Sequence, residues 1–190
     1  MSKISIFFLI RYILAKPLHL FVKNRKGVAA TEFAMVVPIM IGLYMGAVEV
    51  GQALTIDRKL TGLASAAADL VAQSKSITES EIQDIFKITD SILEPFDTAT
   101  LKITLSSVVS DTDNKQSVEW SVSNAGLEHS IGSSIPGMSA DATEANSSVI
   151  VAEVKYTYTS PVSYYFTGDT NLSEMFFARP RKSLTVELTN

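Results

Sequence analysis

The sequence contains no cysteine and only two histidines, His19 and His129. The absence of cysteine excludes a disulfide scaffold, a thiolate zinc site and a thiol nucleophile, although it does not exclude an oxidising compartment. Two histidines disfavour a histidine-based metal cluster, and no Walker loop or dinucleotide fingerprint occurs. We therefore expect no metal, no cofactor and no catalytic residue, and a protein that is not an enzyme.

Acidic residues are also missing from residues 1–27, which contain six basic residues and end at Gly27. The rest of the chain carries the other ten Lys and Arg and all 20 Asp and Glu. A basic arm before an apolar helix is the positive-inside signal, which predicts a cytoplasmic N-terminus and an acidic remainder on the far side of the membrane. Such an acidic remainder disfavours binding to nucleic acid.

Residues 1–27 are interpreted as a basic leader. The apolar stretch from Ile4 to Leu14 is too short to span a bilayer, and Arg11 interrupts it. A secretory signal peptide is the alternative, but Lys16 and Pro17 follow the apolar stretch where a small-x-small cleavage site would be needed.

The apolar run from Val28 to Val50 is long enough to cross a membrane, at roughly 34 Å as a helix. We expect a membrane-spanning helix over residues 28–52. Pro38 is expected to kink it, as neighbouring helices can tolerate. Gly42 and Gly46 form a Gly-x-x-x-Gly pair that allows close helix packing, although glycine is also simply common in membrane helices.

Two carboxylates, Glu32 and Glu49, bound the uncharged part of this helix. An ionised group within a membrane helix costs about 2.5 kcal/mol or more at the centre and less near the interface, so it usually has a partner or a function. Glu32 lies five residues after Gly27. Glycine is small and flexible, so a protease could bind and cut the chain at this position. The alternative is that Glu32 simply lies in the headgroup region.

A helical stem is predicted to follow over residues 53–95. Apolar residues at helical spacing continue after the membrane segment, namely Leu54, Leu60, Leu63, Ala67, Leu70 and Val71. Thr78-x-x-Glu81 has the form of a capping box and predicts the start of a second helix, which Pro95 ends.

After Pro95 the apolar period changes to two, which predicts strands. Leu101–Leu105 and Val118–Val122 form the expected hairpin around the turn residues Asp111–Asn114. A third strand is expected over Val149–Tyr158 and a fourth over Leu184–Leu188. The predicted fold class is α+β: a membrane helix continues into a helical stem, and a small antiparallel sheet of about four strands lies in an extracytoplasmic domain at 96–190.

Three weaker patterns in this domain are interpreted as structural. Glu128-His129-Ser130 contains the residue types of a catalytic triad, but sequence neighbours rarely form one, and they lie in the Gly/Ser/Ala-rich loop 126–146. Asp111, Asp113 and Asn114 lack the spacing of an EF-hand and are expected to form a solvated turn. Most of the aromatic residues Tyr156, Tyr158, Tyr164, Tyr165, Phe166, Phe176 and Phe177 are expected to pack under the sheet, and a partner surface is the alternative.

The segment Arg25–Leu54, RKGVAATEFAMVVPIMIGLYMGAVEVGQAL, resembles the N-terminal signature of TadE-like proteins, pilin-like components of tight-adherence (Flp/Tad) pilus systems. The matching features are Gly27, the Ala-Ala-Thr-Glu-Phe stretch, Pro38 and Gly46-x-x-Glu49. Val50 and Gln52 depart from the signature, which commonly has an aromatic and a basic residue there. The stretch Val154–Val186, with Pro161, an aromatic loop and Ala178-Arg179-Pro180-Arg181, is more loosely similar to the C-terminal pattern of that family.

The resemblance implies that a prepilin peptidase removes the leader between Gly27 and Val28. The new α-amino group, with a pKa near 8, could then pair with Glu32 of an adjacent subunit. The implied docking residues are Glu32 and Phe33, and the implied helix-packing residues are Pro38, Gly42, Gly46 and Glu49.

The resulting hypothesis is a minor pilin or pseudopilin that acts in assembly of a tight-adherence pilus or a related secretion machine. Its expected location is the bacterial inner membrane, in a single pass, and it could also be part of a pilus. The expected partners are other pilin-like subunits, pilus assembly proteins, the prepilin peptidase and membrane lipid. The alternative is a single-pass membrane receptor or adhesin with a ligand-binding outer domain.

Overall fold

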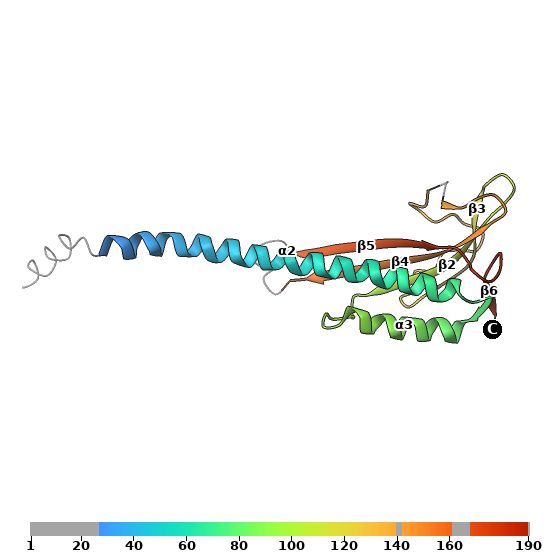
Figure 1. Cartoon of the computed structure of the whole chain (residues 1–190), viewed down its shortest axis with the longest axis horizontal. Coiled ribbons are helices and arrows are strands. Elements are labelled where there is room, and N and C mark those ends of the chain that lie inside the picture. Colours follow the sequence, from blue (N-terminus) through green and yellow to red (C-terminus); the bar gives the residue numbers. More distant parts are fainter. Residues whose placement is uncertain (1–26, 140–141, 161–167, 190) are drawn as a thin grey trace, which may run out of the picture. The chain divides into compact units, whose positions relative to one another are not determined.

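The computed structural model describes residues 27–139, 142–160 and 168–189 (Figure 1). The leader up to residue 26 and the aromatic residues Tyr164, Tyr165 and Phe166 lie outside the described residues. Contacts divide the chain into two compact units, residues 1–47 and 48–190. The fold class is α+β, as the sequence predicts.

The first element is the helix α2 (Val28–Ala72), which contributes residues to both units. Pro38 lies inside it, and the helix continues on both sides of this proline. The apolar stripe predicted for the stem is largely confirmed, because Leu60, Leu63 and Val71 are fully buried. Two predicted members of the stripe are wrong: Leu54 is 52% exposed and Leu70 is 39% exposed.

A short strand, β1 (Ser76–Thr78), leads into the second helix, α3 (Glu79–Leu93). The predicted capping box is confirmed. The backbone N–H of Thr78 donates to Glu81 Oε2 at 2.8 Å, and the N–H of Glu81 donates to Thr78 Oγ1 at 3.2 Å. These bonds satisfy N–H groups that the first turn of a helix leaves without partners.

The main sheet has four antiparallel strands in the order β3-β2-β4-β5. Its members are β2 (Lys102–Ser110), β3 (Gln116–Ser123), β4 (Ser148–Thr159) and β5 (Asp169–Ala178). The predicted hairpin and the predicted third strand are therefore present. Asn114 turns the β2–β3 hairpin with a φ of 60°, a conformation that asparagine tolerates better than most residues.

The predicted C-terminal strand is present only in part, and it does not belong to the main sheet. Leu184 is 81% exposed, and the C-terminal strand β6 (Glu187–Thr189) pairs in parallel with β1 in a separate two-stranded sheet. The fourth strand of the main sheet is instead β5, which pairs with β4 from Thr159↔Asp169 to Ile150↔Ala178.

The core of the second unit lies between the sheet and the two helices. One buried cluster joins α2 and α3 residues such as Leu63 and Phe86 to sheet residues such as Leu105 and Ala152. Trp120 belongs to it, and its indole N–H donates to the Val186 carbonyl at 2.6 Å. A smaller cluster on the opposite face of the sheet includes Ile135 of the loop.

Candidate functional site

The predicted processing and docking residues lie at the start of α2, and all four are exposed. Val28 is 50% exposed and Phe33 is 67% exposed, and Gly27 and Glu32 are also exposed. The Thr31 hydroxyl donates to the Val28 carbonyl at 2.8 Å, a local bond within the first turn. A cleaved chain would therefore begin at an accessible helix end, with one carboxylate a turn away.

The predicted packing residues Pro38, Gly42 and Gly46 lie along the same segment. A Cβ added at Gly42 or Gly46 would meet nothing within 4 Å, so the close approach that this pair permits is not used within the described chain. Both glycines remain open to another helix.

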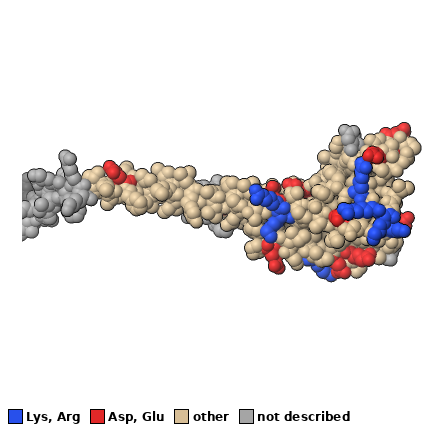
Figure 2. Space-filling model, in the orientation of Figure 1, with Lys and Arg blue, Asp and Glu red and all other residues tan. Residues whose placement is uncertain are grey.

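The apolar residues around these glycines are exposed to an extent unusual for a soluble protein. Met35, Ile39, Leu43 and Tyr44 are 77%, 65%, 71% and 72% exposed. Figure 2 shows the surface of this segment as almost free of charge, with one acidic residue near its start. The most apolar stretch of α2 has a mean hydropathy of 1.9 and none of it is buried within the chain. Large exposed apolar surfaces mark contacts with membranes or other proteins, so α2 is a candidate membrane span.

Glu49 and Gln52 belong to the second unit, where Gln52 binds β4 and Glu49 binds Ser160, the residue that follows β4. The Ser160 hydroxyl donates to Glu49 Oε2, and the Tyr158 hydroxyl donates to Gln52 Oε1 at 2.7 Å. Burial, and secondarily the negative charge of Glu49, raises the pKa of Tyr158 above its ordinary value. These bonds attach the second half of α2 to the sheet.

Sequence reasoning missed both partners, Tyr158 of β4 and Ser160 directly after it. Tyr158 was predicted only as core, where it lies, being 5% exposed. No motif distinguishes Ser160, which lies 111 positions after Glu49. Gln52, a departure from the signature that the sequence resembles, accepts one of these bonds.

The weaker polar patterns form pairwise and turn contacts in the described part of the chain. The His129 ring contacts the Glu153 carboxylate of β4, while Ser130 accepts a bond from Ser133 through its carbonyl, so the three neighbours do not form a triad. Asp111 Oδ1 accepts the N–H groups of Asp113 and Lys115, as expected for a turn. Among the described residues no group of three or more His, Asp and Glu could hold a metal ion.

The segment that begins at Gly27 matches a known protein family. Residues 27–69 match a family model described as TadE-like protein. This segment is TadE-like. The match begins at Gly27 and ends within α2, so the TadE-like segment holds every predicted site residue, while the sheet lies outside it. No curated protein and no solved structure matches the chain.

Proposed function

We propose that the protein is a TadE-like minor pilin or pseudopilin that acts in assembly of a tight-adherence pilus or a related secretion machine. The observation that carries this proposal is the family match over residues 27–69, which includes the exposed apolar part of α2. A pilus-associated protein of this kind acts by binding other subunits, without enzymatic chemistry.

In this proposal the apolar half of α2 first lies in the inner membrane and then packs against helices of other pilin-like subunits. The open surface at Gly42 and Gly46 supports close packing, because a neighbouring backbone can approach where no side chain intervenes. The six basic residues of the leader support a cytoplasmic N-terminus, which places the acidic second unit outside the cytoplasm.

Glu32 is proposed to accept the α-amino group of Val28 from an adjacent, processed subunit. Its exposure supports this role, since Glu32 has no ion-pair partner among the residues that the structure describes. An unpaired carboxylate between lipid tails is costly, whereas a paired one is compensated and fixes the axial register of the two helices.

The Glu32→Val substitution tests the proposal in the organism that makes the pilus. We expect normal membrane insertion, because a charge is removed from an apolar helix, but loss of most surface pili counted by electron microscopy. Thr31→Val, one position away and also exposed, is the matched control and is expected to keep normal piliation. Normal piliation in Glu32→Val would contradict the docking role and favour a receptor or adhesin.

A further inference from the structure

The two edge strands of the main sheet, β3 and β5, differ in whether their outer backbone groups have partners. The outer edge of β3 is covered, because the Val118 N–H donates to the Ser133 carbonyl at 2.9 Å and the Gly132 N–H donates to the Val118 carbonyl at 2.8 Å. The strand β5 pairs with β4 on one side. On its other side it forms no backbone hydrogen bond with any residue that the structure describes.

An open edge strand is a template for another strand, and proteins usually protect such edges with proline, lysine, bulges or a covering segment. β5 is 10 residues long and contains neither proline nor lysine. Its second half, Met175–Ala178, is apolar, and Phe177 is 37% exposed. Among the described residues, no proline, lysine or covering segment protects this half of the edge against strand addition.

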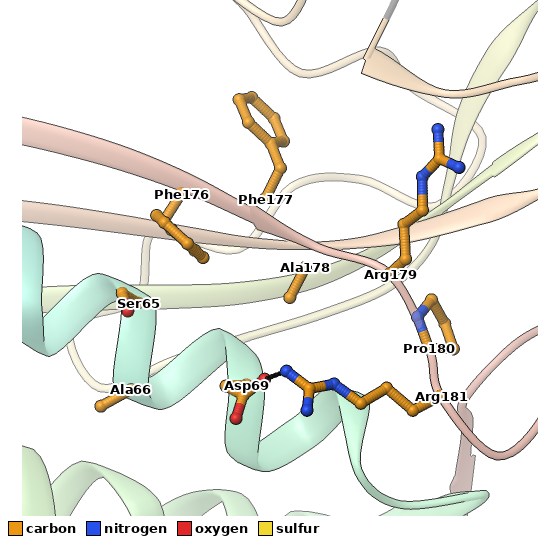
Figure 3. Close-up of a pocket in the computed structure, with 9 residues that line it drawn as sticks. All are labelled: Ser65, Ala66, Asp69, Phe176, Phe177, Ala178, Arg179, Pro180 and Arg181. Carbon is orange, nitrogen blue, oxygen red and sulfur yellow. Dashed lines mark hydrogen bonds and ion pairs between the residues drawn. The ribbon is translucent and has the colours of Figure 1, made fainter.

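A hollow of about 610 Å³ lies beside this half of β5 (Figure 3). Its α2 wall is built from the small residues Ser65 and Ala66 together with Asp69. Phe176 and Ala178 point from the strand toward the helix, while Phe177 points away from it. The hollow can take side chains of a strand added beside β5.

Two arginines, Arg179 and Arg181, line one end of the hollow in an otherwise acidic unit. Arg179, Arg181 and Lys182 are three of the ten Lys and Arg residues that follow Gly27. Arg179 Nη2 lies 2.9 Å from Glu144 Oε1, and Arg181 pairs with Asp69. All four side chains are at least 37% exposed. Exposed ion pairs contribute only about 0–1 kcal/mol, so a bound carboxylate could replace either acid at little cost.

Two ways of pairing a second copy of this chain with the edge are disfavoured. Gln52 binds Tyr158, which pairs with Thr170 at the start of β5, whereas Asp69 pairs with Arg181 beyond its end. α2 and β5 therefore run in the same direction. Antiparallel pairing of two β5 strands would place the Val48 ends of two copies at opposite ends, which two chains anchored in one membrane cannot adopt. Pairing of β5 with β3 of the next copy is blocked by the segment that covers β3.

We propose that β5 is the docking edge for an extended acidic segment of a different protein. The segment adds a fifth strand to the four-stranded sheet, places apolar side chains in the hollow, and meets Arg179 and Arg181 with carboxylates. Main-chain hydrogen bonds supply affinity in this mode, and side-chain pockets supply specificity. The preference for a different protein over a second copy rests on the membrane anchor of the proposed function.

The full chain in detergent micelles can be titrated with a fluorescent ten-residue peptide of alternating valine and glutamate. We expect saturable binding, and at least tenfold weaker binding to the double variant Arg179→Glu, Arg181→Glu. The matched control is Lys102→Glu, Lys155→Glu, which changes the net charge equally at two exposed lysines that face each other on β2 and β4. This control is expected to bind within twofold of the unchanged chain.

Two further measurements locate the peptide. A benzophenone side chain in place of Phe177 should cross-link to it, whereas one in place of Ile131, which is 79% exposed, should not. The infrared amide band of a ¹³C-labelled peptide should be that of a strand. Equal binding of a valine–lysine peptide, a helical band, or Phe177 cross-links that yield only dimers of this chain would overturn the proposal. None of these results depends on piliation, so they are separable from the Glu32 test.

Discussion

Two regions of the molecule differ in what surrounds their side chains. One is the TadE-like start of α2, residues 28–47, and the other is the unit formed by residues 48–190. In the first region the large apolar side chains are exposed, and the glycines have open space beside them. In the second region the helices and the sheet share one buried cluster, and polar groups such as Glu49 and Tyr158 bind partners that are distant in sequence. The first region leaves its apolar surface without contacts from the described chain, whereas the second is stabilised by its own contacts.

Among the changes that test this difference between the two regions, loss of processing is expected to have the largest effect. We expect Gly27→Phe to yield a chain that keeps its leader, because a bulky side chain replaces the small joint before Val28. Mass spectrometry of purified membranes would find the mass of the full-length chain in place of one that begins at Val28. Gly62→Phe is the matched control, since its site also has open space but lies in the second unit. A wild-type chain that always begins at Met1 would refute processing at Gly27.

The elements that could be predicted from sequence are those with local signals. The capping box at Thr78 and Glu81 marks the start of α3 because both of its hydrogen bonds join residues three positions apart. The β2–β3 hairpin follows from alternating apolar residues and a turn rich in Asp and Asn. The apolar run at the start of α2 needs only length and composition to identify it.

The elements that could not be predicted depend on long-range pairing. β5 contains Asp169, Asn171 and Ser173, residues that disfavour strands, and it is a strand because β4 pairs with it along its whole length. Leu184–Leu188 alternates like a strand, but its last residues pair with β1, about a hundred positions earlier. The partners of Glu49 and Gln52 were missed for the same reason, since nothing near them in sequence indicates Ser160 or Tyr158.

Substitution of two leucines of α2, one in each region, compares how much each region contributes to stability. Leu63 is fully buried and Leu43 is 71% exposed, and both lie in α2. We expect Leu63→Ala to lower the free energy of unfolding of the second unit by about 2–5 kcal/mol, because it leaves a cavity in the core. Leu43→Ala should change it by less than about 0.5 kcal/mol. Denaturant unfolding in micelles, followed by the fluorescence of Trp120, compares the two, and equal losses would contradict the division.

The smallest expected effect concerns pH and the cap of α3. The backbone N–H and then the hydroxyl of Thr78, which both donate to Glu81, hold the pKa of this carboxyl below its ordinary value. Because the folded pKa is lowered, the stabilisation is fully present above the unfolded pKa of about 4.3 and is lost as pH falls through the folded value. The carboxyl is fully exposed, so solvent screening keeps the effect small.

Glu81→Gln isolates this contribution, because the amide can still accept the Thr78 bonds but carries no charge to titrate. We expect the unchanged chain to be slightly more stable than the variant near neutral pH, and the difference to shrink toward zero in acid. The described residues give the apolar start of α2 no such cap interaction, so its helix content by circular dichroism in micelles should not follow this titration. A stability difference that stays constant with pH, or a Glu81 pKa at or above 4.3 by NMR, would show that the cap does not depend on the ionised carboxylate.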